Sequence, residues 1–169
     1  MSFISEQLLT ININLKPDEM KTDIDNLIKQ KLKEKIECKC SENGYILKDS
    51  IIIIKRSLGK IQTFNQKSII TFIITYKAKV ISPIKGLSLD VYINNINKMG
   101  VIAFIKLGIK ENETFDDSPL IIILPKEYFN ENTQSFEDLK INQKINITVV
   151  GSRIKYNSDK IQVVGKPTE

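Results

Sequence analysis

The stretch that decides the fold is Tyr76-Lys77-Ala78-Lys79-Val80-Ile81-Ser82-Pro83-Ile84-Lys85-Gly86. Apolar and polar residues alternate up to Val80, which is the two-residue period of a half-buried strand. Pro83 and Gly86 then turn the chain, and a second alternation begins at Leu87. We therefore expect two small folded units, residues 1–82 and residues 83–169, joined with almost no linker.

The pattern before this corner predicts an α+β unit in which one helix packs on a curved antiparallel sheet. The alternation of residues 9–15 predicts a first strand, and Pro17 opens a helix predicted over residues 17–36, where apolar residues recur every three or four positions. Three strands are expected to follow. The first covers residues 45–55, with the run 51–54 buried on both faces, and the last alternates from residue 70 to residue 80.

The pattern after the corner predicts an all-β barrel of the OB type. Five short strands are expected, with bends marked by glycine and a longer connection between the third and the fourth, which is the organisation of a five-stranded Greek-key barrel. The predicted strands are residues 87–93, 100–107, 120–124, 145–151 and 160–164, with a turn at residues 94–98.

The net charge of +5 is unevenly distributed along the chain. Residues 1–80 carry 14 basic and 9 acidic side chains, whereas residues 81–169 carry 11 of each. Acidic residues gather between positions 110 and 140, where they form either a partner surface or a solvated loop. They are Glu111, Glu113, Asp116, Asp117, Glu127, Glu131, Glu137 and Asp138.

Several classes of function find no support in the residues. The chain has no histidine, no Gly-x-Ser-x-Gly, no phosphate-binding glycine loop and no apolar run of the roughly 18 residues that span a bilayer. Cys38 and Cys40 cannot complete a tetrahedral metal site without further ligands, so we interpret them as reduced thiols. We expect a soluble, intracellular protein that is not an enzyme and holds neither metal nor cofactor.

Binding of single-stranded RNA is the activity that an OB barrel suggests, because such barrels combine cations for phosphates with aromatic faces for bases. Ile102, Phe104 and Lys106 share one face of a regular strand. Phe104 is then either a stacking platform beside Lys106 or a core residue. The cations Arg153, Lys155 and Lys160 flank a turn at residues 156–158, which predicts charge and an aromatic side chain at one rim of the barrel.

Short motifs spread over nearly the whole chain resemble the stalk subunit shared by archaeal and eukaryotic RNA polymerases, which is the seventh subunit of RNA polymerase II. The two most specific are the Pro-x-x-Gly corner at residues 83–86 and an Asn-Lys-x-Gly turn at residues 97–100. The others are Leu15-Lys16-Pro17, Gly44-Tyr45-Ile46, Thr75-Tyr76-Lys77-Ala78 and Ile147-Thr148-Val149-Val150-Gly151-Ser152-Arg153.

This resemblance implies a non-catalytic subunit whose N-terminal unit docks on the polymerase core while its OB barrel projects beside emerging RNA. The implied docking residues are Ser57, Leu58, Gly59, Lys60, Ile61 and Phe64. The candidate RNA-binding residues of the predicted barrel are Lys85, Lys98, Phe104, Lys106, Arg153, Lys155 and Lys160. The implied partners are the core subunits, a second stalk subunit and nascent single-stranded RNA.

The sequence also departs from the family pattern. Leu87 stands where the family is usually acidic, and Ile102 stands where an aromatic residue is usual. The abundance of isoleucine, lysine and asparagine is similar to that of versions carried by large DNA viruses, which would place the protein in the virion or host cytoplasm; a cellular version would be nuclear. A free-standing RNA-binding OB module, such as a translation factor, is the alternative.

Overall fold

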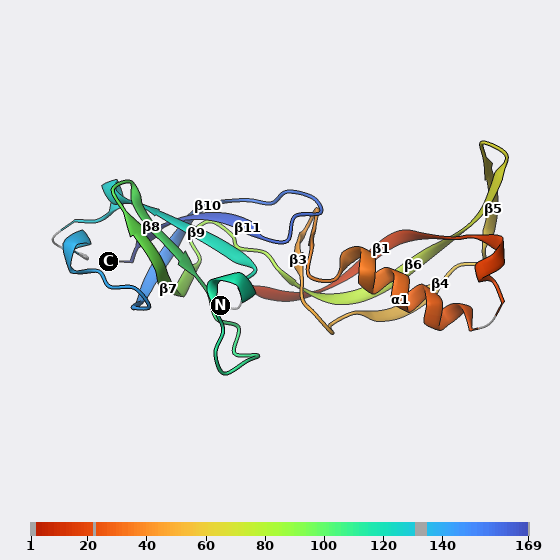
Figure 1. Cartoon of the computed structure of the whole chain (residues 1–169), viewed down its shortest axis with the longest axis horizontal. Helices are drawn as coiled ribbons and strands as arrows, with labels where there is room; N and C mark the ends of the chain where they lie inside the picture. Colours follow the sequence, from red (N-terminus) through yellow and green to blue (C-terminus); the bar gives the residue numbers. More distant parts are fainter. Residues whose placement is uncertain (1–2, 22, 131–134, 169) are drawn as a thin grey trace.

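A computed structural model describes residues 3–21, 23–130 and 135–168. The molecule is elongated and mostly β, with an antiparallel sheet and a helix at one end and a closed five-stranded barrel at the other (Figure 1). The corner at residues 82–87 connects these two parts.

The sheet is organised around one long strand, β6 (Lys67–Ile81), whose 15 residues extend over about 50 Å at the usual rise per residue. β1 (Ile4–Leu15) pairs with it along its whole length, from Ile4 opposite Ile81 to Leu15 opposite Ile70. The other edge of β6 pairs in succession with β3 (Gly44–Ile46), β4 (Ile52–Arg56) and β5 (Lys60–Phe64), and β2 (Cys40–Ser41) pairs with β3.

The helix α1 (Ile24–Ile36) packs on one face of this sheet. Its buried residues Ile28, Leu32 and Ile36 belong to the same core cluster as Phe72 and Ile74 of β6. The alternation predicted for residues 70–80 is confirmed, because the even-numbered side chains from residue 72 to residue 80 are buried.

The prediction of one helix over residues 17–36 is wrong at its beginning. Pro17–Glu19 forms a separate 3-10 turn, in which the Glu19 carboxylate accepts a hydrogen bond from the Lys16 amide at 2.8 Å. α1 starts only after Asp23, which has left-handed backbone angles and caps the helix by accepting from the Asn26 amide. The left-handed residue prevents the turn and the helix from becoming continuous.

The predicted strand over residues 45–55 is also wrong in part. It divides into β3 and β4, and within the run 51–54 the side chains of Ile52 and Ile54 are exposed while Ile51 is buried. A bulge between Ile53 and Lys55 shifts the pairing with β6. Burial on both faces would require a second layer, but α1 covers one face of the sheet and leaves these two isoleucines exposed.

The barrel consists of β7 (Ser88–Asn97), β8 (Gly100–Phe104), β9 (Leu120–Pro125), β10 (Lys144–Arg153) and β11 (Ile161–Pro167). The strand order is β10-β11-β9-β8-β7, and β7 pairs with β10 to close the ring. β9 and β11 pair in parallel. Five strands in this order are consistent with the predicted OB-type barrel. β7 continues through the predicted turn at 94–98 as far as Asn97, and β8 ends at Phe104.

Hydrogen bonds hold the corner between sheet and barrel on both sides. The Gly86 amide donates to the Val149 carbonyl at 2.8 Å, and the Ser152 hydroxyl donates to the Pro83 carbonyl at 3.0 Å. On the sheet side, the Ser82 amide donates to the Phe3 carbonyl at 3.0 Å. The core of the barrel continues into the sheet, because Cys40 and Ile81 are buried in the barrel's core cluster.

Candidate interaction surfaces

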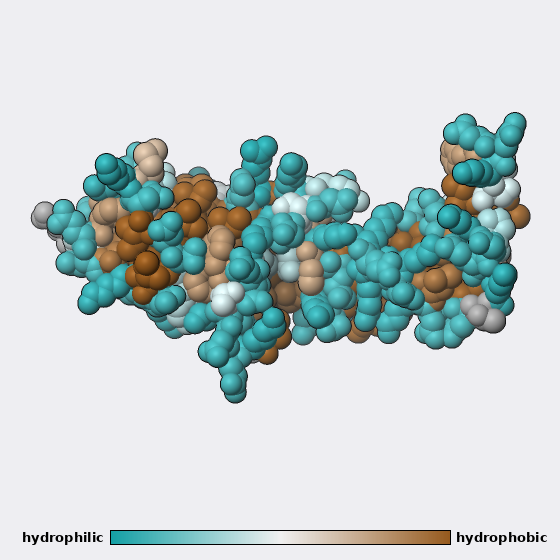
Figure 2. All heavy atoms as spheres, in the orientation of Figure 1, coloured by the Kyte–Doolittle hydropathy of each residue, from teal (hydrophilic) through white to brown (hydrophobic). Residues whose placement is uncertain are grey.

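The first candidate surface is a hairpin that extends from the end of the sheet farthest from the barrel (Figure 1). We call residues 57–71 the distal hairpin. Asn65 and Gln66 at its turn both have positive φ, as two-residue hairpin turns of the type that matches strand twist require. Leu58, Ile61 and Phe64 are 90%, 71% and 58% exposed. Figure 2 shows apolar atoms on the flank of this hairpin beneath a polar tip.

The base of the distal hairpin is firmly attached to the sheet. The Ser57 amide donates to the Ile73 carbonyl at 2.9 Å, and the Ser57 hydroxyl accepts from the Ile73 amide at 2.8 Å. A Cβ at Gly59 would lie 2.7 Å from Ile70 Cγ2 and 3.0 Å from the Phe72 ring. Of the residues implied for docking, Ser57 and Gly59 therefore fix the hairpin, whereas Leu58, Lys60, Ile61 and Phe64 face outward.

A groove of about 790 Å³ lies beside the distal hairpin. It separates the hairpin from the turn that follows β1. Its lining includes the apolar residues Leu15, Pro17, Phe64 and Ile69 and the cations Lys16, Lys31 and Lys67, together with Asp18. Lys31 is paired with Glu19 at 2.9 Å. The distal end of the molecule thus combines apolar and basic surface.

Phe104 is buried outside the barrel's core cluster, opposite its cross-strand partner Tyr92, so it is neither the exposed stacking platform nor the core residue that the sequence left open. Its side chain is 3% exposed, and its ring lies 6.0 Å from that of Tyr92 and 6.3 Å from that of Phe115. Lys106 places its ammonium 4.3 Å above the half-buried Tyr92 ring. Sequence reasoning missed Tyr92, although it falls on the polar side of the alternation that begins at Leu87.

The ammonium of Lys160 is bonded to backbone carbonyls within the barrel. Its ammonium donates to the carbonyls of Phe115, Asp116 and Ser118 at 3.0, 3.1 and 2.6 Å. These contacts use the three donors that an ammonium possesses. Lys160 therefore holds residues 115–118 against the start of β11 and is not available to bind phosphate.

The remaining predicted RNA-binding residues are exposed but lie at different places on the barrel. Lys98 belongs to the β7–β8 turn, at the end where Gly100 pairs with Pro125. Arg153 and Lys155 lie at the opposite end, where Ile161 pairs with Leu120. With Ile121 and Gln162 they line a hollow of about 250 Å³, which we call the barrel hollow. Lys85 is exposed at the corner.

The acidic residues of the loop between β8 and β9 are partly engaged within the loop. Glu113 accepts hydrogen bonds from the Ile109 and Lys110 amides at 2.6 and 3.2 Å; burial alone would raise its pKa, but these backbone donors lower it overall. The Thr114 amide and Lys110 lower the pKa of Asp117 to about 2. Glu131 lies outside the described residues.

No metal site is visible among residues 3–21, 23–130 and 135–168, where no three histidine, cysteine or carboxylate side chains gather. Cys38 and Cys40 are free thiols, and burial, followed by the charge of Asp159, raises the pKa of Cys40 to about 11. Within the same ranges, no helix is long and apolar enough to span a membrane.

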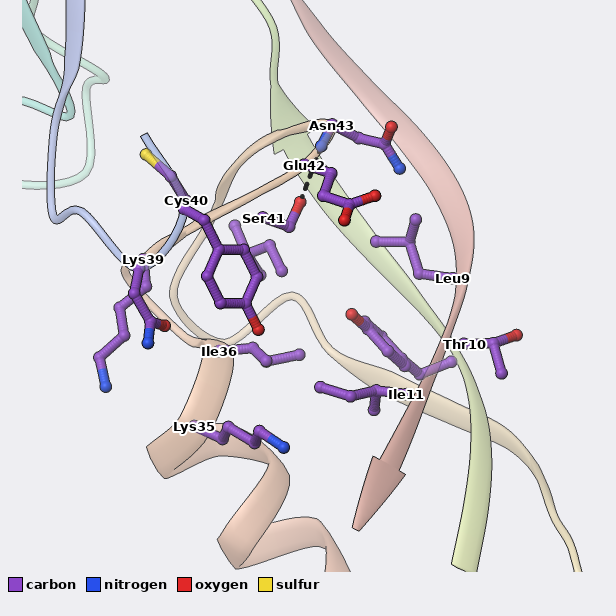
Figure 3. Close-up of a pocket in the computed structure, with 14 residues that line it drawn as sticks. Leu9, Thr10, Ile11, Lys35, Ile36, Lys39, Cys40, Ser41, Glu42 and Asn43 are labelled. Carbon is purple, nitrogen blue, oxygen red and sulfur yellow. Dashed lines mark hydrogen bonds between the residues drawn. The ribbon is translucent and has the colours of Figure 1, made fainter. Parts of the chain in front are cut away.

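A second hollow, of about 240 Å³, lies where the barrel meets the sheet (Figure 3). We call it the joint hollow. Lys35, in the last turn of α1, and Lys39, three residues after the helix ends, lie at its margin, across from the β1 residues Leu9 and Thr10. Its other lining residues are Ile11, Ile36, Cys40, Ser41, Glu42, Asn43, Ile46 and Tyr76 from the sheet and helix side and Tyr156 and Asn157 from the barrel. Burial, and secondarily Tyr156, raises the pKa of Tyr76.

Comparison with known proteins gives a similarity that covers both parts of the chain. No protein-family model matches. The chain is 22% identical over 167 residues to a protein of Acanthamoeba polyphaga mimivirus that carries the provisional name of a DNA-directed RNA polymerase subunit. The alignment covers 91% of this chain and 76% of that protein, so it includes residues of the sheet and of the barrel.

Proposed function

We propose that this protein is a non-catalytic stalk subunit of a DNA-directed RNA polymerase. In this proposal, residues 1–82 form the unit that docks on the polymerase core, and residues 83–169 form an OB barrel that weakly contacts nascent RNA. The similarity to a viral RNA polymerase subunit supports membership of such a complex.

The observation that carries the docking role is the distal hairpin. Leu58, Ile61 and Phe64 present large apolar side chains to solvent on a hairpin whose base is fixed by Ser57 and Gly59. An exposed apolar group on a rigid support is typical of a surface that becomes buried against a partner, because little conformational freedom is lost on binding. The position of the hairpin at the end away from the barrel leaves the barrel free to project.

The proposed RNA contacts are the cations that the structure leaves accessible. The remaining candidates are Lys85, Lys98, Lys106, Arg153 and Lys155. Tyr92 is added to them because the Lys106 ammonium lies over its ring. Phe104 and Lys160 are omitted, since the first is buried between Tyr92 and Phe115 and the ammonium of the second is bonded to carbonyl groups. Phosphate contacts of this kind predict weak affinity that falls steeply with salt.

The docking role is tested by affinity purification of the tagged full-length chain from cells that contain its polymerase. The readout is recovery of the two largest polymerase subunits, identified by mass spectrometry. Replacement of Leu58, Ile61 and Phe64 together by serine should abolish their recovery while the melting temperature stays near that of the wild type. Leu8→Ser, at an exposed apolar position on another part of the sheet, is the matched control. Normal recovery with the triple variant would exclude the hairpin as the docking element.

A free-standing RNA-binding module is the second candidate, and the Tyr92–Lys106 pair and the barrel hollow are the features that favour it. It predicts RNA binding by the isolated chain without recovery of any polymerase subunit. The purification described above separates the two functions directly.

A further inference from the structure

The segment that links β10 to β11 borders both the barrel hollow and the joint hollow. Arg153 and Lys155 line the barrel hollow, and the next residues, Tyr156 and Asn157, line the joint hollow. Tyr156 is 60% exposed. An accessible aromatic ring therefore lies between a basic hollow on the barrel and a second hollow that includes the end of α1.

This segment is held in place by the sheet. The Asn157 amide donates to the Cys40 carbonyl at 2.9 Å, and the Cys40 amide donates to the Ser158 carbonyl at 2.7 Å. These two bonds hold Asn157 and Ser158, the residues that directly follow Tyr156, against the sheet. A ring presented by a fixed turn loses little freedom when a ligand packs on it.

The cations along this path are free to take a ligand. Among the described residues, Arg153, Lys155, Lys35 and Lys39 form no salt bridge. Lys35 donates to the Asn12 carbonyl at 3.3 Å and Lys39 to the Glu34 carbonyl at 3.1 Å, which leaves further ammonium donors on each. The acidic residues that line the two hollows are Glu42 and Asp159, so four available cations face two carboxylates.

The size and lining of the joint hollow indicate the class of ligand. Its volume of about 240 Å³ lies below the roughly 300–1,000 Å³ of pockets that enclose a whole small-molecule ligand. Its polar lining includes Thr10, Asn43 and Asn157, which can hydrogen-bond to base edges or to hydroxyl groups. A cationic path with an exposed aromatic ring is the arrangement that binds single-stranded nucleic acid.

We propose that single-stranded RNA crosses the joint between barrel and sheet, with a base stacked on Tyr156. Arg153 and Lys155 contact phosphates on the barrel side, and Lys39 and Lys35 contact them on the helix side. This site extends the RNA contact of the proposed function onto the N-terminal unit, and it relies on that function for the identity of the ligand.

The test is fluorescence anisotropy of a labelled 12-nucleotide single-stranded RNA of mixed sequence with the full-length chain, at several salt concentrations. Tyr156→Ala should weaken binding by about fivefold to 150-fold, the loss expected for one stacked base, whereas Tyr156→Phe should retain binding. Lys39→Glu should weaken binding and reduce the slope of log K against log salt by about 0.7. Lys29→Glu is the control, because Lys29 is an exposed lysine of α1 that lines neither hollow.

The outcomes separate this site from the proposed function. Loss of binding with Tyr156→Ala and Lys39→Glu, but not with Lys29→Glu, supports the path across the joint. Binding that is lost only with Arg153→Glu and Lys155→Glu would confine RNA to the barrel and overturn the path, while the barrel contact of the proposed function would stand. Absence of binding by the wild-type chain would overturn both RNA assignments, whereas docking is judged separately from recovery of polymerase subunits by the hairpin variant.

Discussion

The backbone amide of Cys40 donates a hydrogen bond of 2.7 Å to the carbonyl of Ser158 and so connects the edge of the sheet to the barrel. The Asn157 amide returns a bond of 2.9 Å to the Cys40 carbonyl. The corner at residues 82–87 is the first attachment between the two parts of the molecule. This pair of hydrogen bonds is a second one, formed by residues that lie far from the corner in the sequence. Rotation of the barrel about the corner would break both bonds.

The first prediction concerns this second attachment. Asn157 has φ of 63°, so Asn157→Pro would both remove the amide donor and demand an incompatible backbone angle. We expect faster hydrogen exchange at the Cys40 amide, because its bond depends on the position of the same turn. Asn157→Gly retains the amide and accepts positive φ, so exchange at Cys40 should stay close to that of the wild type. Equal exchange rates in all three proteins would show that the turn does not hold the joint.

The second prediction concerns the base of the distal hairpin. Gly59→Ala places a methyl group 2.7 Å from Ile70 Cγ2, which is shorter than packing allows, and 3.0 Å from the Phe72 ring, which is a tight contact. We expect the free energy of unfolding to fall by about 1–3 kcal/mol, measured by urea denaturation, because the overpacked base must shift. Gly151→Ala meets no atom within 4 Å at its Cβ and should change stability by less than about 0.5 kcal/mol. A similar change in both variants would mean that the hairpin base adapts freely.

The third prediction distinguishes a structural lysine from an RNA-binding lysine. Lys160→Met leaves three carbonyls without their ammonium donor, so we expect a loss of about 1–3 kcal/mol in unfolding free energy. Amides of residues 115–118 should exchange faster with solvent. Lys155→Met, at an exposed position, should leave stability unchanged. Reduced RNA affinity of Lys160→Met at wild-type stability would instead support the RNA-binding role that the sequence pattern predicted.

The fourth prediction concerns the loop between β8 and β9. The pKa of Glu113 is lower in the folded protein than its ordinary value of 4.5, so its carboxylate stabilises the fold above that pH, and this contribution is lost as the pH falls through the lowered value. Glu113→Gln should therefore lower the melting temperature at pH 7, and its difference from the wild type should narrow toward pH 4. Glu111→Gln, at an exposed position of the same loop, is the control. A difference independent of pH would contradict the charge-dependent bonds.

The barrel strands and β6 could be predicted from the sequence because each buries one face, and a period of two then marks the strand. The same reasoning failed at residues 51–54, since four consecutive isoleucines do not reveal whether a second layer covers the other face of the sheet. It failed at residue 17 because proline followed by two acidic residues suits a 3-10 turn as well as the start of an α-helix.

The residues implied for docking came from the family resemblance, and the structure places them in the distal hairpin. The role of Lys160 depends on carbonyl groups that lie 42 to 45 residues earlier in the chain, so no local pattern could indicate it. The joint hollow likewise combines side chains of α1 with a turn of the barrel more than 100 residues later.

The position of β11 between β9 and β10 has a consequence for the synthesis of the protein. While residues 161–167 are still inside the ribosome, β9 and β10 each present an unpaired edge, and such edges favour association with other chains. The barrel can close only after this strand emerges, whereas every strand of the sheet is complete once Ile81 has left the ribosome. Nascent chains should therefore carry a folded N-terminal sheet and an open, aggregation-prone barrel. Any delay in the emergence of β11 from the ribosome would prolong that state.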